Sequence, residues 1–146
     1  MFHFGKDRLT VDRAIALINK KEEFALVEEV KANILQSQKN VEEIVESDKT
    51  VYGVNTGFGP LCTVKISPEE TKKLQENILQ SHAVGVGEPI ADDLVRIMLL
   101  TKLHALARGF SGIKLDTYER ILYFFENDIL PRVPEQGSVG ASGDLA

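Results

Sequence analysis

The chain has 146 residues, of which 43% are hydrophobic and 27% charged, with a formal net charge of −5. This composition is that of a globular protein with a core of its own, and no apolar run is long enough to cross a bilayer. No cluster of lysine and arginine stands out, which argues against nucleic-acid binding and against a basic membrane-surface helix. A single cysteine, Cys62, and an N-terminus without the layout of a secretion signal predict a cytoplasmic protein.

The spacing of apolar residues is helical almost throughout and predicts an all-α fold. Thr10 suits the N-cap of a first helix over residues 11–19, and apolar residues at three- and four-residue steps predict a longer helix over residues 23–47. The third helix has the clearest start, because Ser67 followed by Pro68 combines an N-cap serine with a proline at the first helical position.

The fourth helix, expected over residues 92–108, carries apolar residues around most of its circumference, which is typical of a helix surrounded by others. Gly109 suits its C-terminal stop. The fifth helix is expected to begin at a capping box of Asp116 and Glu119 and to end before Pro131. Because the chain stops where a glycine-rich turn leads into a further helix, we expect it to be part of a longer subunit.

Small residues dominate the last ten positions, GSVGASGDLA. The ordinary interpretation is a tight turn in which Ser142 or Asp144 caps the next helix. The alternative is backbone cyclisation, in which the amide nitrogen of Gly143 attacks the carbonyl carbon of Ala141, since small residues allow the sharp bend that this needs. Loss of water from the serine then leaves an exocyclic methylene, an electrophile that no ordinary side chain provides. Taken alone, the tetrapeptide favours neither interpretation.

Four glycine-containing motifs together resemble the aromatic amino acid ammonia-lyases, over nearly the whole chain from about Thr10. They are YGVNTGFG at 52–59, SHAVGVGEP at 81–89, RGFSG at 108–112 and GSVGASGDLA at 137–146. Members of this family form a 4-methylidene-imidazole-5-one (MIO) group from Ala-Ser-Gly. The resemblance therefore implies an MIO built from Ala141, Ser142 and Gly143, with Asp144 in a supporting position.

The resemblance also implies a fold and an assembly. Residues 1–146 are expected to be the N-terminal, active-site-forming portion of a mostly helical, aspartase/fumarase-like subunit, truncated at the MIO motif. Family active sites are assembled from several subunits, so we expect a homotetramer for the full-length protein and no activity for this fragment. The expected partner is a small-molecule amino acid, with no nucleotide, nucleic acid or membrane. With one cysteine and no close cluster of His, Asp and Glu, no metal site is suggested.

Tyr52 stands at the head of a glycine-rich loop. From the residues alone it is a half-buried tyrosine that closes a short strand over residues 50–52, and a phosphate cradle is weaker because the P-loop lysine is missing. The resemblance makes Tyr52 the general base that takes the β-proton of the substrate. A free phenol has a pKa of about 10, so this role needs a stabilised phenolate or an acidified proton. Asn55 and Thr56 are interpreted as turn hydrogen-bonding residues without a catalytic role.

His82 falls on the same face of the third helix as Leu74 and Ile78, so we expect its ring to point inward. A lone histidine here would ordinarily satisfy the last helical carbonyls. The resemblance places a substrate-selecting residue at this position, and Ser-His followed by a small residue is similar to the histidine-specific members. An imidazole can hydrogen-bond a substrate imidazole, and it can equally hold a tyrosine hydroxyl. His104, mid-helix among leucines, is interpreted as structural.

The resemblance thus implies elimination of ammonia from L-histidine to give trans-urocanate, the first step of histidine catabolism. A tyrosine ammonia-lyase or aminomutase of the same family is the nearer alternative. The remoter alternative is a non-catalytic helical interaction module, for which the apolar fourth helix would be the docking surface.

Overall fold

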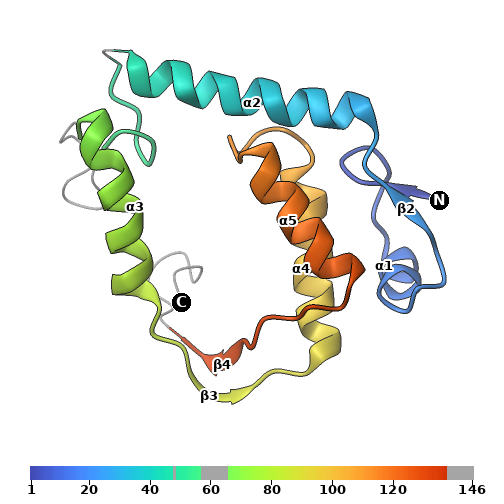
Figure 1. Cartoon of the computed structure of the whole chain (residues 1–146). Coiled ribbons are helices and arrows are strands. Elements are labelled where there is room, and N and C mark those ends of the chain that lie inside the picture. Colours follow the sequence, from blue (N-terminus) through green and yellow to red (C-terminus); the bar gives the residue numbers. More distant parts are fainter. Residues whose placement is uncertain (48, 57–65, 138–146) are drawn as a thin grey trace. The chain divides into compact units, whose positions relative to one another are not determined.

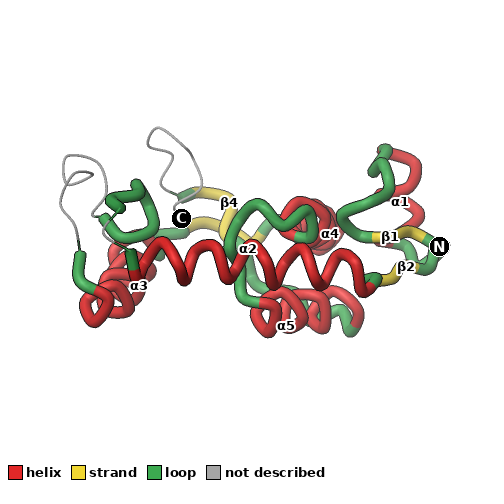
Figure 2. Tube along the Cα trace, turned by 90° about the horizontal axis from the view of Figure 1, so that it is seen from above, coloured by secondary structure: helices red, strands yellow, loops and turns green. Residues whose placement is uncertain are grey.

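The structure is a computed structural model that describes residues 1–47, 49–56 and 66–137 (Figure 1). Helices make up most of this part of the chain (Figure 2): α1 (Val11–Ile18), α2 (Glu28–Glu46), α3 (Pro68–His82), α4 (Asp92–Leu106) and α5 (Leu115–Glu126). The strands are short: β1 (Phe2–His3), β2 (Phe24–Ala25), β3 (Val86–Pro89) and β4 (Pro134–Gln136). The predicted helical fold class is confirmed. Within the described residues, none of the helices has the length and apolar character needed to span a membrane.

The chain divides into two compact units, each made from two separate stretches of sequence. Unit 1 contains Met1–Asn40 and Ile90–Arg132, and unit 2 contains Val41–Pro89 and Val133–Ala146. Tyr52, Asn55, Thr56 and His82 therefore belong to unit 2. His104 belongs to unit 1.

Unit 1 holds an apolar core. Its buried side chains come from β1 and the segment after it, and from α1, α2, α4 and α5: Phe2, Phe4, Leu17, Val30, Ile34, Leu100, Leu103, Ala107, Tyr118 and Phe125. The aromatic rings pack edge to face, as between Phe2 and Phe4, whose centroids lie 5.5 Å apart.

Two helices begin where their capping residues predict. Thr10 precedes α1, and its hydroxyl accepts a hydrogen bond from the backbone N–H of Arg13 at 3.4 Å. Ser67 precedes α3, and its hydroxyl accepts from the N–H of Glu70 at 3.3 Å. Both bonds satisfy a backbone donor that the first helical turn leaves open.

The fourth helix begins at Asp92 as predicted. The predicted starts of α2 and α5 are wrong, because contacts distant in sequence decide them. The helix expected from residue 23 begins at Glu28, since Phe24 pairs in parallel with Phe2 as part of a two-residue strand. The capping box of Asp116 and Glu119 is not formed, because α5 already begins at Leu115.

A side chain of α2 anchors that earlier start of α5. The backbone N–H of Leu115 donates to Oε1 of Gln38 at 3.3 Å, which supplies an acceptor from another helix. Asp116 instead lies inside the first turn, where its negative charge interacts favourably with the helix dipole.

Gly109 ends α4 as predicted, although the helix stops at Leu106, two residues earlier than expected. Gly109 has a φ of +73°, the left-handed conformation that glycine adopts without steric cost.

Candidate active site

The structure describes two of the predicted site residues, Tyr52 and His82, and both lie in unit 2. The predicted MIO residues Ala141, Ser142 and Gly143, with the neighbouring Asp144, lie outside the described residues. The part of the candidate site that the structure describes consists of the turn that contains Tyr52, the end of α3, and the strands β3 and β4.

Tyr52 lies in a tight turn rather than in the short strand expected over residues 50–52. The carbonyl of Val51 accepts hydrogen bonds from the N–H groups of Val54 at 3.1 Å and Asn55 at 3.3 Å. Gly53 has a φ of +76°, which turns the chain back at the residue after the tyrosine. The strand interpretation is wrong because this left-handed glycine and the doubly bonded carbonyl close a turn. The side chain of Tyr52 is 62% exposed.

Asn55 is buried beneath this turn with only 1% of its surface exposed. Its Oδ1 accepts from the N–H of Val51 at 2.8 Å, and its Nδ2 donates to the carbonyl oxygens of Lys49 at 2.8 Å and Ile44 at 3.4 Å. A buried amide is stable only when its donors and acceptor find such partners.

Thr56 is completely buried, and its Oγ1 accepts a hydrogen bond from the N–H of Gly53 at 3.2 Å. The interpretation of Asn55 and Thr56 as turn hydrogen-bonding residues is confirmed. Their burial was not expected, because polar side chains in a glycine-rich loop are more often exposed. The signal that the sequence offers is their position two and three residues after the turn-forming Gly53.

His82 is the last residue of α3, and its ring returns onto the helix. Its Nδ1 lies 3.0 Å from the carbonyl oxygen of Ile78 and 2.8 Å from Oγ of Ser81. In the neutral tautomer with the proton on Nδ1, this atom donates to the Ile78 carbonyl and Nε2 is an acceptor. In the other neutral tautomer Nδ1 accepts from the Ser81 hydroxyl and Nε2 is a donor. The first tautomer thus satisfies a terminal helical carbonyl, and both still offer one hydrogen-bonding atom to a ligand.

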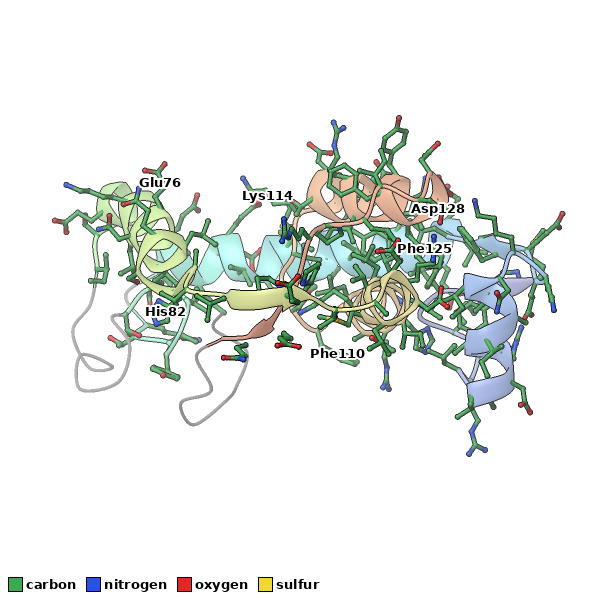
Figure 3. All side chains as sticks on the ribbon, turned by 90° about the horizontal axis from the view of Figure 1, so that it is seen from below. Glu76, His82, Phe110, Lys114, Phe125 and Asp128 are labelled. Carbon is green, nitrogen blue, oxygen red and sulfur yellow. The ribbon has the colours of Figure 1, made fainter. Side chains whose placement is uncertain are left out.

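The predicted face of α3 is also confirmed. Leu74, Ile78 and His82 are half-buried, whereas Glu76 is exposed. In Figure 3 the labelled side chains of Glu76 and His82 lie on different sides of the helix. The four-residue spacing therefore separates the two faces as helical geometry requires.

The strand pair β3–β4 joins the two stretches of unit 2. The strands run antiparallel, with Val86 opposite Gln136 and Pro89 opposite Pro134. Gly85 permits this close approach, because an ideal Cβ there would lie 2.9 Å from Cγ of Pro134. The pairing places the residue before Gly137, where the last motif begins, beside the segment that follows His82. The motif at 81–89 does not reveal this pairing, because it connects positions about fifty residues apart.

His104 lies in unit 1, where it has a structural contact. Its Nδ1 accepts from the N–H of Gly5 at 3.2 Å, and its ring packs against Phe2 with centroids 5.3 Å apart. Its interpretation as a structural residue is confirmed. Within the described ranges, no group of three or more His, Cys, Asp or Glu side chains is arranged to hold a metal ion.

Known proteins resemble this chain over nearly all of its length. A family model described as aromatic amino acid lyase matches residues 9–146. Histidine ammonia-lyase of Streptococcus gordonii is 44% identical over 140 residues, which are 96% of this chain and 27% of that protein. The chain therefore spans just over a quarter of the length of the curated relatives that it matches.

Solved structures agree with this result. Histidine ammonia-lyase from Trypanosoma cruzi has a TM-score of 0.79 at 34% identity, covering 95% of this chain and 27% of that chain. Tyrosine aminomutase from Streptomyces globisporus has a TM-score of 0.85 at 29% identity, covering 95% of this chain and 26% of that chain. The match of the family model over residues 9–146 shows that the chain belongs to the aromatic amino acid lyase family.

Proposed function

We propose that the full-length protein is an ammonia-lyase that converts L-histidine to trans-urocanate and ammonia. The observation that carries this proposal is the 44% identity to a histidine ammonia-lyase over 96% of the chain. The chemical difficulty is twofold, because the amine is a poor leaving group and the β-proton of the substrate is weakly acidic.

The sequence contains the residues that an MIO group requires. Gly143 supplies a backbone nucleophile without a Cβ, Ala141 a small first residue, and Ser142 a hydroxyl that can leave as water. Asp144 supports this segment as a cap for a following helix or as an aid to cyclisation. Once formed, the MIO supplies an electrophile that captures the substrate.

Tyr52 is the proposed general base that takes the β-proton at its phenolic oxygen. Its exposed side chain on an anchored turn suits a group that must reach a substrate. A base positioned in this way typically contributes about 10²- to 10⁴-fold to the rate. Tyr52→Phe in the full-length protein is expected to lower kcat by that order, with the protein still folded.

His82 is the proposed specificity residue. In the tautomer whose Nδ1 proton is donated to the Ile78 carbonyl, Nε2 can accept a hydrogen bond from the N–H of a substrate imidazole. A tyrosine hydroxyl can donate to the same atom, and the structural likeness to a tyrosine aminomutase favours this second candidate substrate.

An assay of the full-length protein with both substrates separates these two candidates, because urocanate and coumarate absorb at different ultraviolet wavelengths. We expect urocanate, and His82→Phe is expected to lower kcat/KM for histidine by at least about tenfold, since the substrate N–H loses its buried partner. Formation of coumarate without urocanate would show that the substrate is tyrosine rather than histidine. Undiminished turnover of either substrate by Ser142→Ala would contradict the MIO mechanism itself.

The proposal extends to assembly and location. The full-length protein is a cytoplasmic homotetramer that acts on a small-molecule amino acid, in keeping with its single cysteine and its family. Sedimentation of the full-length protein measures the subunit number, and a stable monomer with full activity would contradict shared active sites.

A further inference from the structure

The two backbone amides that flank Tyr52 are both held by buried side chains. On one side the N–H of Val51 donates to Oδ1 of Asn55 at 2.8 Å, and on the other the N–H of Gly53 donates to Oγ1 of Thr56 at 3.2 Å. Asn55 is 1% exposed and Thr56 0%, whereas Tyr52 between their hydrogen bonds is 62% exposed. The turn thus has polar side chains on its buried side and an aromatic side chain on its exposed side.

Asn55, on the buried side of the turn, makes three further hydrogen bonds. Asn55 donates to the carbonyl oxygen of Ile44, in the last turn of α2, as well as to that of Lys49. Its own carbonyl accepts from the N–H of Ile66 at 2.9 Å, which ties the segment before α3 to the same residue. Asn55 therefore connects the Tyr52 turn to α2 and to the approach to α3.

We propose that Asn55 and Thr56 are positioning residues for Tyr52, which fix the backbone on both sides of it so that the phenol is presented from a preformed turn. The proposal rests on the proposed role of Tyr52 as the general base. Its physical basis is that a misplacement of about 1 Å can cost about 10²-fold in rate. With both flanking amides fixed, only the side-chain torsions of Tyr52 remain to be set.

The test in the full-length protein uses the isosteric substitutions Thr56→Val and Asn55→Asp, which keep the shape of the buried site, together with Thr56→Ser, which keeps the hydroxyl. Thr56→Val removes the acceptor for the Gly53 amide, and Thr56→Ser restores it. Asn55→Asp keeps an acceptor for the Val51 amide but replaces the donor that faces the carbonyls of Lys49 and Ile44. Thr101→Val is the matched control, since the Thr101 hydroxyl bonds only to carbonyls of its own helix, those of Ile97 and Met98.

We expect Thr56→Val to lower kcat by about tenfold or more with KM changed little, whereas Thr56→Ser and Thr101→Val stay near the starting enzyme. The discriminating measurement is the primary isotope effect with β-deuterated substrate, histidine or tyrosine according to which one the enzyme turns over. A displaced base slows proton removal specifically, so the isotope effect should rise in Thr56→Val. A general loss of folded enzyme would lower kcat and leave the isotope effect unchanged.

A second measurement does not depend on activity. Hydrogen exchange of the Gly53 amide should become faster in Thr56→Val, and that of the Val51 amide should keep its protection there and lose part of it in Asn55→Asp. Unchanged exchange of Gly53 would show that the hydrogen bond to Thr56 is not made, and would overturn the proposal.

The outcomes also separate this proposal from the proposed function. A fall in kcat of Thr56→Val without a change in the isotope effect, in an enzyme that Tyr52→Phe inactivates, overturns the positioning role and leaves Tyr52 as the base. Undiminished turnover by Tyr52→Phe would contradict the role of Tyr52 as the general base, and with it the positioning role of Asn55 and Thr56.

Discussion

At the scale of single residues, His104 shows how burial changes the chemistry of a side chain. Its Nδ1 accepts the N–H of Gly5, and only an unprotonated nitrogen can do so. Burial lowers the pKa of His104 below its ordinary value of 6.5, and the positive charge of Arg108 lowers it further. The folded protein therefore favours the neutral imidazole.

This shift predicts a pH-dependent stability. Because the unfolded chain binds a proton at a higher pH than the folded chain, the free energy of unfolding rises with pH between the two pKa values. The contribution of His104 is complete above about pH 6.5 and is lost as the pH falls through the folded-state pKa. The urea concentration at the midpoint of unfolding of the full-length protein should therefore decrease as the pH is lowered between these two pKa values. His104→Asn keeps an acceptor that does not titrate, so an equal fall in that variant would contradict the assignment.

The residues of the candidate site differ in how well the sequence predicts them. The half-burial of His82 on the same face as Ile78 and Leu74 follows from their four-residue spacing, which is a local property of a helix. The burial of Asn55 does not follow from any spacing, because it depends on carbonyls of Lys49 and Ile44 that the folded chain brings to it. The spacing of apolar residues predicts which face of a helix is buried, but it does not predict whether a loop residue such as Asn55 is buried.

At the scale of elements, the same distinction explains the helix starts. Thr10 and Ser67 are capping residues next to the helices that they begin, and both starts were predicted. The starts at Glu28 and Leu115 depend on a strand pair with Phe2 and on the side chain of Gln38. These partners are distant in sequence, so a reading of adjacent residues cannot identify them.

The end of α4 gives a prediction about stability. Gly109 has a φ of +73°, and an ideal Cβ there would lie 2.9 Å from the carbonyl oxygen of Asn33 in α2. Gly109→Ala is therefore expected to lower the free energy of unfolding by more than about 1 kcal/mol, because strain and overlap with fixed backbone act together.

Gly53→Ala is the matched control in urea unfolding of the same protein. Gly53 has a similar φ of +76°, and an ideal Cβ there meets no atom of the described residues within 4 Å. Gly53→Ala should lower the free energy of unfolding by less than Gly109→Ala does, because only the left-handed conformation opposes the substitution at Gly53. Equal losses in the two variants would show that the approach of α4 to α2 contributes nothing to the cost at Gly109.

At the scale of the whole molecule, both units are assembled from stretches that are separated along the chain. Unit 1 combines Met1–Asn40 with Ile90–Arg132, and the two stretches of unit 2 meet through β3 and β4. The helical class was predicted from periodicity, whereas this division was not, because it depends on which distant segments pack together.

The length relative to known proteins predicts what residues 1–146 do alone. Since they span 27% of a relative such as the S. gordonii enzyme, we expect no lyase activity from this polypeptide and no cyclisation of Ala141-Ser142-Gly143. Mass spectrometry would show the loss of two waters if the ring formed, and a urocanate assay reports turnover. Either signal from the isolated polypeptide would mean that these residues are sufficient for that step.

The interleaving of the two units also has a consequence during translation. Once Arg132 has left the ribosome, both stretches of unit 1 are available, whereas unit 2 still lacks β4. The apolar core of unit 1 can therefore close while β3 still waits for its partner strand. A nascent chain that stalls at this stage has a core, whereas Ser142, the serine proposed to contribute to the MIO group, has not yet emerged from the ribosome.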